Sequence, residues 1–300
     1  MVTSTVERLE QLLNCTVQDW NTLLSINLSN CNITLLPPEV DRWTSATHIR
    51  LRGNQLTLLP DAVSGWTSAT HISLHGNRLT SLPDAVSGWT SATHISLGGN
   101  QLSSLPDGVK GWTSATHISL WHNRLTLLPD AVKGWTSATD IDLDGNQLIS
   151  LPDAVSGWTS ATSISLSDNQ LTFIPDAVSG WTSATHIYLF GNQLTFLPDA
   201  VKGWTSATHI YLCGNPILFV DDNLCGKCWY SYYRDDLFFS LQNKKKIQNR
   251  YACKIQKIYR RHYEKRNNAA VIIQKAYIDH FYRVHGTWYN KVYKKYLTFK

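Results

Sequence analysis

The sequence has no apolar run long enough to span a membrane and no secretory signal at its start. Its first residues, MVTSTVERLEQLLN, are amphipathic and acidic, whereas a signal peptide has a basic start followed by an apolar stretch. Cysteine is scarce as well, and the six thiols are irregularly placed, which favours reduced cysteines over a disulfide framework. Sequons at Asn14, Asn27 and Asn32 then carry little weight. We expect an intracellular protein, cytoplasmic or nuclear.

Catalytic motifs are absent too. No glycine-rich phosphate loop follows a strand pattern, and no nucleophile elbow is present. Cys225 and Cys228 form one C-x-x-C pair, but only Cys213 and Cys253 remain as companions, so the spacing does not favour zinc. A ligase that uses a tail cysteine as nucleophile is disfavoured, because residues 227–300 are few for a catalytic domain. We predict no catalytic residue, no metal site and no cofactor.

One repeated unit fills most of the chain. Nine of the twelve tryptophans recur every 23 residues without an insertion: Trp20, Trp43, Trp66, Trp89, Trp112, Trp135, Trp158, Trp181 and Trp204. A fixed period of roughly 20 to 50 residues is typical of a solenoid, in which each unit stacks on the next.

The unit reads W-T-S-A-T-x-I-x-L-x-G-N-Q-L-T-x-L-P-D-A-V-x-G. Ile72 and Leu74 alternate with polar neighbours, the period of two expected for a strand with one buried face. The spacing L-x-x-L-x-L-x-x-N-x-L-x-x-L-P is matched by Ala69, Ile72, Leu74, Asn77, Leu79 and Leu82–Pro83. On this pattern residues 20–226 resemble leucine-rich repeats. The resemblance implies an α/β repeat solenoid, a horseshoe whose short parallel strands line the concave face.

Three recurring positions carry structural expectations. Trp and Ala stand where the family has two leucines, a volume-conserving exchange that favours a buried tryptophan. Asparagine recurs from position 54 to position 215 and can stack as a hydrogen-bonded ladder, with Cys31 in its place in the first repeat. The glycine before most of these asparagines is replaced by His122 and Asp168, which are among the side chains that tolerate positive φ.

The exposed strand positions vary and are candidate contacts. The first of them reads Ser25, His48, His71, His94, His117, Asp140, Ser163, His186 and His209. Parallel strands lie ~4.8 Å apart, so these imidazoles can form a stacked row. Such a row can bind metal or sense pH, because crowded imidazoles resist simultaneous protonation. Alternatively, one histidine was simply copied with the repeat.

Acidic and aromatic residues gather farther along the same face. The acidic patch comprises Asp140, Asp142, Asp144 and Asp168, with His117, Trp121 and His122 beside it. Carboxylates ~6.6 Å apart along a strand do not form a ready-made Ca²⁺ cage. We interpret the patch, with its aromatic anchor, as a receptor for a basic partner segment; the alternative is drift on a solvated face. Beyond it, Tyr188, Phe190 and Tyr211 form a second contact surface or pack against the tail.

The net charge of +5 conceals a sharp split. Residues 1–226 contain 9 basic and 18 acidic side chains, a net of −9, whereas residues 227–300 contain 18 and 4, a net of +14. This asymmetry favours two parts with different partners. We divide the chain into an N-terminal helical cap (1–19), nine repeats (20–226), and a C-terminal cap with a basic, mainly α-helical tail (227–300).

The tail contains two short motifs. IQKIYRRHYEK resembles an IQ motif, I-Q-x-x-x-R-G-x-x-x-R/K: Ile255, Gln256, Arg260 and Lys265 match, while Arg261 replaces the usual glycine. IQKAYIDHFYR keeps Ile273, Gln274 and Arg283 but has Ile278 at the position of the first arginine. The resemblance implies calmodulin or a related EF-hand protein as a partner.

Other partners remain open for the tail. Eleven of the thirteen tyrosines and eighteen basic residues lie beyond residue 226, a composition suited to non-specific binding of nucleic-acid phosphates. A third alternative is that the basic tail docks on the acidic repeats. The near-identical repeats and the W-T-S-A-T wording resemble repeat proteins of large DNA viruses of amoebae, which implies a host or virion partner. We predict a non-enzymatic scaffold or adaptor for protein–protein interaction; the sequence does not specify its oligomeric state.

Overall fold

The computed structural model describes residues 4–217. Contacts divide the chain into two units, Met1–Tyr232 and Tyr233–Lys300, and every described residue belongs to the first. The basic tail that the sequence predicts, with both IQ-like motifs, lies outside the described residues.

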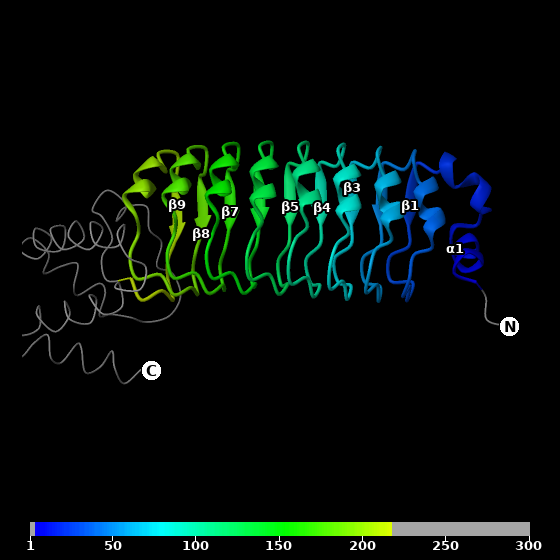
Figure 1. Ribbon diagram of the computed structural model, residues 1–300, viewed down its shortest axis with the longest axis horizontal. Coiled ribbons are helices and arrows are strands. Elements are labelled where there is room, and N and C mark those ends of the chain that lie inside the picture. The colour runs from blue at the N-terminus through cyan, green and yellow to red at the C-terminus, as the bar shows by residue number, and fades with distance from the viewer. Residues whose placement is uncertain (1–3, 218–300) are drawn as a thin grey trace, which may run out of the picture. The chain divides into compact units, whose positions relative to one another are not determined.

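Each described repeat contributes one three-residue strand to a parallel sheet whose strand order follows the sequence (Figure 1). The strands are β1 Ser25–Asn27, β2 His48–Arg50, β3 His71–Ser73, β4 His94–Ser96, β5 His117–Ser119, β6 Asp140–Asp142, β7 Ser163–Ser165, β8 His186–Tyr188 and β9 His209–Tyr211. Every residue pairs with its equivalent 23 positions on, as Ile72 does with Ile95. The predicted parallel sheet is confirmed.

The opposite side of the array is built from 3₁₀ turns. They are η1 Val17–Thr22, η2 Pro38–Arg42, η3 Asp61–Gly65, η4 Asp84–Gly88, η5 Asp107–Gly111, η6 Asp130–Gly134, η7 Asp153–Gly157, η8 Asp176–Gly180 and η9 Asp199–Gly203. Proline stands just before most of these turns, as Pro60 does before η3, so its fixed φ leads the chain into the turn. Five residues make little more than one turn, which suits the tighter 3₁₀ geometry.

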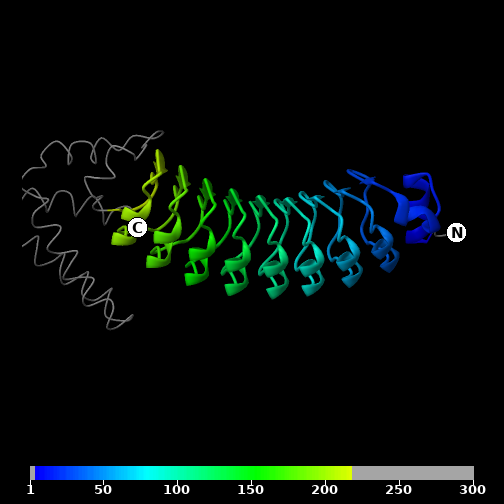
Figure 2. The same ribbon diagram turned by 90° about the horizontal axis from the view of Figure 1, so that it is seen from above.

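The two sides of the array have different spacings. Neighbouring tryptophan rings, which follow the 3₁₀ turns, have centroids 5.7–5.9 Å apart, whereas stacked histidine rings on the strand face are 4.3–4.6 Å apart. Because the repeats are closer on the strand side, the array bends toward the strands, which lie on its concave face (Figure 2).

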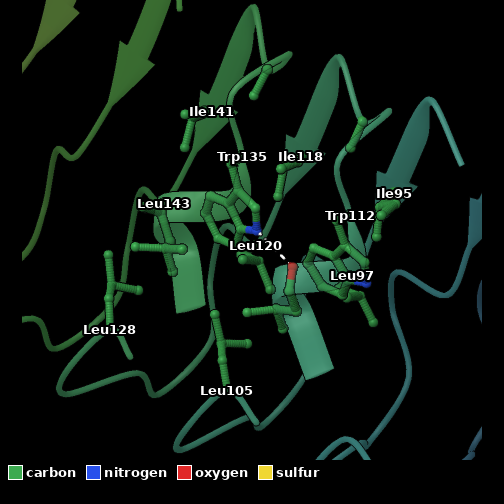
Figure 3. Close-up of a cluster of buried hydrophobic side chains, with 14 of the residues drawn as sticks. Ile95, Leu97, Leu105, Trp112, Ile118, Leu120, Leu128, Trp135, Ile141 and Leu143 are labelled. Atoms are coloured by element: carbon green, nitrogen blue, oxygen red, sulfur yellow. Dashed lines mark hydrogen bonds between the residues drawn. The ribbon is translucent and has the colours of Figure 1, made fainter. Parts of the chain in front are cut away.

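The repeated tryptophans form the centre of the core. All nine are at most 1% exposed, which confirms the predicted burial. From Trp66 onward each indole Nε1–H donates to a valine carbonyl of the preceding repeat, as Trp135 does to Val109 at 3.1 Å (Figure 3). Buried indole nitrogens need such partners, so the ladder combines apolar packing with hydrogen-bond satisfaction. The first two rungs differ: within residues 4–217, Trp20 and Trp43 have no hydrogen-bond partner at Nε1.

The asparagine ladder is confirmed as well. Asn123 donates from Nδ2 to the carbonyls of Leu97 and Leu120, and its Oδ1 accepts the N–H of Leu102. One side chain thereby satisfies backbone groups of two adjacent repeats where no strand ladder reaches them. At Cys31 the ladder begins differently, because the Cys31 N–H donates to Asn54 of the following repeat.

A short α-helix, α1 Thr5–Leu13, covers the first repeat (Figure 1). It begins with a capping box between Ser4 and Glu7, and it ends at Asn14 in left-handed conformation with φ 54°. Leu9 is fully buried on the first repeat, and Arg8 donates to the Cys31 carbonyl at 2.8 Å. An open solenoid end would expose core, so this helix closes it.

Candidate interaction face

The concave face carries a histidine stack formed by His48, His71, His94 and His117. Consecutive rings are nearly parallel, with interplanar angles of 8–10° and centroids 4.3–4.5 Å apart. Asp140 and Ser163 interrupt the row, which resumes as a pair between His186 and His209, 4.6 Å apart. The predicted stacking of the row is therefore confirmed.

A threonine before each histidine orients the ring. The Thr70 hydroxyl donates to the Thr47 carbonyl at 3.0 Å and also lies 3.0 Å from His71 Nδ1. A hydroxyl has one proton, and here a carbonyl accepts it, so the hydrogen on the second contact must come from the imidazole. The stacked rings are thus Nδ1–H tautomers, and each presents its Nε2 lone pair at the outer edge.

The stack ends against a carboxylate. His117 Nε2 lies 3.5 Å from Asp140 Oδ2, and both side chains are about half exposed (50% and 47%). Asp140 differs from the histidines, because a carboxylate has no proton to donate to the threonine before it. Its Oδ2 instead accepts from the Thr139 hydroxyl, which also lies within hydrogen-bond distance of the Thr116 carbonyl. A proton on His117 would turn this contact into an ion pair.

Asp144 and Asp142 are the half-buried members of the acidic patch. Asp144 Oδ1 accepts the Ser165 hydroxyl at 2.7 Å and the Ser167 N–H at 2.6 Å, so the next repeat fixes it. Asp142 Oδ1 accepts the Asp144 N–H at 3.1 Å. These bonds hold both carboxylates in place on β6 and immediately after it.

Burial raises the pKa of Asp142 and, likewise, that of Asp144. The hydrogen bonds from Asp144 N–H and from Ser165 and Ser167 oppose this rise, because they favour the charged form. In residues 4–217 the ion pairs are His117 with Asp140 and Lys202 with Asp199, so neither carboxylate pairs with a lysine or arginine there. Among the described residues, these two partly desolvated carboxyl groups on and just after β6 therefore have no lysine or arginine partner.

Trp121 forms an aromatic shelf beside the patch and is 36% exposed. Its indole lies over Gly98 of the preceding repeat, where a Cβ would come within 2.3 Å of Trp121 Nε1. His122 meets the indole edge to face, with centroids 5.2 Å apart and planes at 77°. The Trp121 indole thus packs against Gly98 and against the His122 imidazole.

The expectation of positive φ is confirmed at the two substituted glycine positions. His122 has φ 47° and Asp168 has φ 51°, in the same left-handed region as Gly99, Gly145 and Gly191 at 63–65°. Farther along the face Tyr188 and Tyr211 stack, with centroids 4.7 Å apart and planes at 3°. Burial, followed by Tyr211 and Asp144, raises the pKa of Tyr188.

The structure brings most of the predicted face together. His117 contacts Asp140, and Trp121 contacts His122. The charge of Asp144 contributes to the raised pKa of Tyr188, and Phe190 follows just after the end of β8. Residues that the sequence did not single out are Gly98, the seat of Trp121, and Ser165 and Ser167, which hold Asp144. A signal for Gly98 was present, since its position holds a side chain in every neighbouring repeat.

Residues 4–217 contain neither a metal cluster nor a membrane-spanning helix. No group of three or more histidine, cysteine or acidic side chains in that range is arranged to hold a metal ion. Likewise, no described helix has the length and apolar character to cross a membrane. Adjacent imidazoles of the stack are parallel, so their lone pairs do not converge on a common point.

Known proteins share this architecture. The Leucine Rich Repeat family model matches residues 22–43. A leucine-rich repeat protein of Leptospira interrogans is similar over 69% of this chain and 59% of its own, with 24% identity and a TM-score of 0.60. The functional domain of InlJ from Listeria monocytogenes is similar over 74% and 52%, with 22% identity and a TM-score of 0.58.

A plant structure is also similar. It is the leucine-rich repeat ectodomain of the membrane receptor kinase GASSHO1/SCHENGEN3 from Arabidopsis thaliana, in complex with Casparian strip integrity factor 2. The likeness covers 61% of this chain and 23% of that one, with 24% identity and a TM-score of 0.55. This chain thus spans less than two thirds of the length of each of these three structures. No curated protein sequence matches it significantly.

Sequence pattern, strand order and these likenesses together define the class: the described chain is a leucine-rich repeat solenoid. Its repeats are 23 residues apart, and leucine-rich repeats commonly mediate protein–protein interaction.

Proposed function

We propose that this protein is a non-enzymatic interaction scaffold that receives a basic segment of a partner protein on its concave face. The observation that carries the proposal is the pair Asp142 and Asp144, which are half-buried, hydrogen-bonded in place, and without a lysine or arginine partner in residues 4–217. A partner lysine or arginine would offset their desolvation, since charge pairs in a partly dry site are stronger than exposed ones.

Trp121 supplies the apolar part of this contact. Tryptophan is enriched among residues that dominate binding, and an indole one repeat before the carboxylate of Asp144 suits the stem of an arginine as well as its charge. The plant receptor ectodomain above was solved with a protein factor bound, which supports a binding role for the fold class. An intracellular setting is part of the proposal.

The test uses a fluorescein-labelled octalysine peptide as a probe, with binding followed by anisotropy at low salt. The double variant Asp142→Asn/Asp144→Asn should bind about tenfold more weakly than the wild-type chain. Its control is Asp61→Asn/Asp84→Asn, which removes the same charge from two exposed 3₁₀ turns and should change affinity by no more than about twofold. Equal weakening in both variants would mean that the probe senses net charge only, and the proposal would fail.

A second function is proposed for the tail, where the charge asymmetry of the sequence favours a separate partner. The segment Ile255 to Lys265 would bind calmodulin or a related EF-hand protein, and the alternative is non-specific binding of nucleic acid through phosphates. One variant distinguishes them: Ile255→Ala/Gln256→Ala keeps every charge. Calmodulin binding, measured with and without calcium, should be lost, whereas salt-dependent DNA retention should stay unchanged. A wild-type chain that does not bind calmodulin would leave the nucleic-acid hypothesis alone, and a variant that still binds it would show that Ile255 and Gln256 are not part of the site.

A further inference from the structure

We infer that the histidine stack and the acidic patch act together as an acid-sensitive release device for the basic partner. Acidification adds positive charge to the stack and removes negative charge from the patch, and both changes expel a cationic segment. This inference rests on the proposed function, because it assigns a regulation to the same face.

Proton uptake by the stack leaves its internal hydrogen bonds intact. The Nδ1–H of each ring already donates to a threonine hydroxyl, as in Thr93 and His94 at 3.0 Å. The free Nε2 is the only nitrogen left to protonate. The stack therefore gains charge without a rearrangement of the sheet beneath it.

Neighbouring rings oppose one another's protonation. Two like charges about 4 Å apart repel each other in water, and they repel more strongly at a partly buried protein surface, where the effective dielectric constant is lower. In keeping with this, burial and then the imidazoles of His94 and His48 lower the pKa of His71, while burial and then His117 lower that of His94. The interior rings therefore take up protons at a lower pH than an ordinary histidine.

The charged groups at the two ends of the stack have opposite signs. Arg50 faces the stack on β2 and contributes to the lowered pKa of His71. Arg52 similarly lowers the pKa of His75, after burial. At the other end, the carboxylate of Asp140 lies 3.5 Å from His117 Nε2. Arg50 thus opposes a positive charge on His71, whereas the other end of the stack adjoins a carboxylate.

The patch changes charge in the same direction. Burial raises the pKa of Asp142 and of Asp144, so they take up protons at a higher pH than ordinary carboxyls. Their facing groups are His122 beside Asp142 and Asp168 beside Asp144. His122 opposes the rise at Asp142, and Asp168 adds to that at Asp144. A fall in pH therefore neutralises these carboxylates while it charges the row of imidazoles next to them.

The test compares the full-length wild type with His71→Gln/His94→Gln/His117→Gln, using the octalysine probe at about pH 8 and about pH 5 and constant ionic strength. The dissociation constant of the wild type should rise at least about tenfold on acidification. The triple variant should show a rise of about threefold, because three of the four stacked imidazoles no longer gain charge while the carboxyls still lose theirs. His75→Gln, on the same face but outside the stack, is the matched control and should behave like the wild type.

Histidine-selective NMR titration of the wild type supplies a readout without any partner. We expect His71 and His94 to take up protons at a lower pH than an ordinary histidine. Four rings titrating together near the ordinary histidine value would overturn the inference, as would a triple variant that keeps the full pH dependence. If octalysine does not bind even at about pH 8, the proposed function fails, and the NMR titration alone decides the behaviour of the stack.

Discussion

Gly145 lies directly beneath the imidazole of His122: a Cβ on Gly145 would come within 2.4 Å of His122 Nδ1. Asp168 covers Gly191 in the same way, and Asn30 covers Gly53. In the described repeats, a side chain at the left-handed position thus fills the space that a Cβ of the next repeat would need. A residue other than glycine at this position therefore occurs only where the next repeat has glycine at the equivalent position.

Replacement of Gly145 by alanine should therefore destabilise the protein more than the same change at Gly76. Both have positive φ, which costs an L-residue roughly 1–2 kcal/mol. At Gly76 the nearest atom to a new Cβ is the Gly53 nitrogen at an ordinary 3.6 Å, so Gly76→Ala adds only this strain. Gly145→Ala must also displace His122, and we expect about 1 kcal/mol more, measured by urea unfolding followed by far-UV circular dichroism.

His122→Gly in the Gly145→Ala background separates the two contributions. Removal of the imidazole should bring the cost of Gly145→Ala down to that of Gly76→Ala, a coupling that a double-mutant cycle measures directly. Additive effects of the two substitutions would show that His122 yields without strain.

A comparison of two buried tryptophans tests the ladder. Trp135→Phe removes a 3.1 Å hydrogen bond to Val109 together with part of the ring, whereas Trp43→Phe removes the same volume from an indole without a hydrogen-bond partner. Both side chains are fully buried. We expect Trp135→Phe to reduce the free energy of unfolding by about 1 kcal/mol more than Trp43→Phe. Equal losses would mean that packing alone, and not the indole N–H, stabilises the ladder.

The sequence predicted the parts of this structure that repetition specifies. A period of 23 residues with alternating Ile and Leu leaves one way to stack the units, so the sheet, the buried Trp66 and the ladder at Asn77 all followed from the pattern. Positive φ at His122 followed as well, because a substitution at a recurrent glycine carries backbone information.

The sequence did not predict the contacts between unlike repeats. Gly98 beneath Trp121, and Ser165 holding Asp144, depend on which side chains become neighbours 21 to 23 residues apart and on the rotamers they adopt. The tautomer of His71 likewise needed the position of the Thr70 hydroxyl. The repeat period predicts where a residue lies in a solenoid, whereas its hydrogen bonds depend on the positions and rotamers of the neighbouring side chains.

The acidic patch should reduce stability at neutral pH. Because the pKa of Asp142 and that of Asp144 are raised, the folded protein binds more protons than the unfolded chain between the ordinary carboxyl value and the raised ones. Stability contributed by this pair is therefore present at low pH and is lost as pH rises through that window. Asp142→Asn/Asp144→Asn should raise the melting temperature at about pH 7, since asparagine Oδ1 can still accept the same bonds, and the gain should vanish below about pH 4. A lower melting temperature at neutral pH would contradict this sign.

The histidine stack should have the opposite pH dependence. His71 and His94 have a lowered pKa in the folded protein, so as pH falls below the ordinary histidine value the unfolded chain takes up protons first. The stability that these neutral rings contribute is complete above about pH 6.5 and is lost progressively below it. His71→Gln/His94→Gln removes both titrating groups, so its melting temperature should fall less than that of the wild type between about pH 7 and about pH 5. Thermal unfolding at constant ionic strength measures this difference. Parallel curves for wild type and double variant would show that stacked imidazoles 4.3 Å apart are charged without penalty, which their geometry opposes.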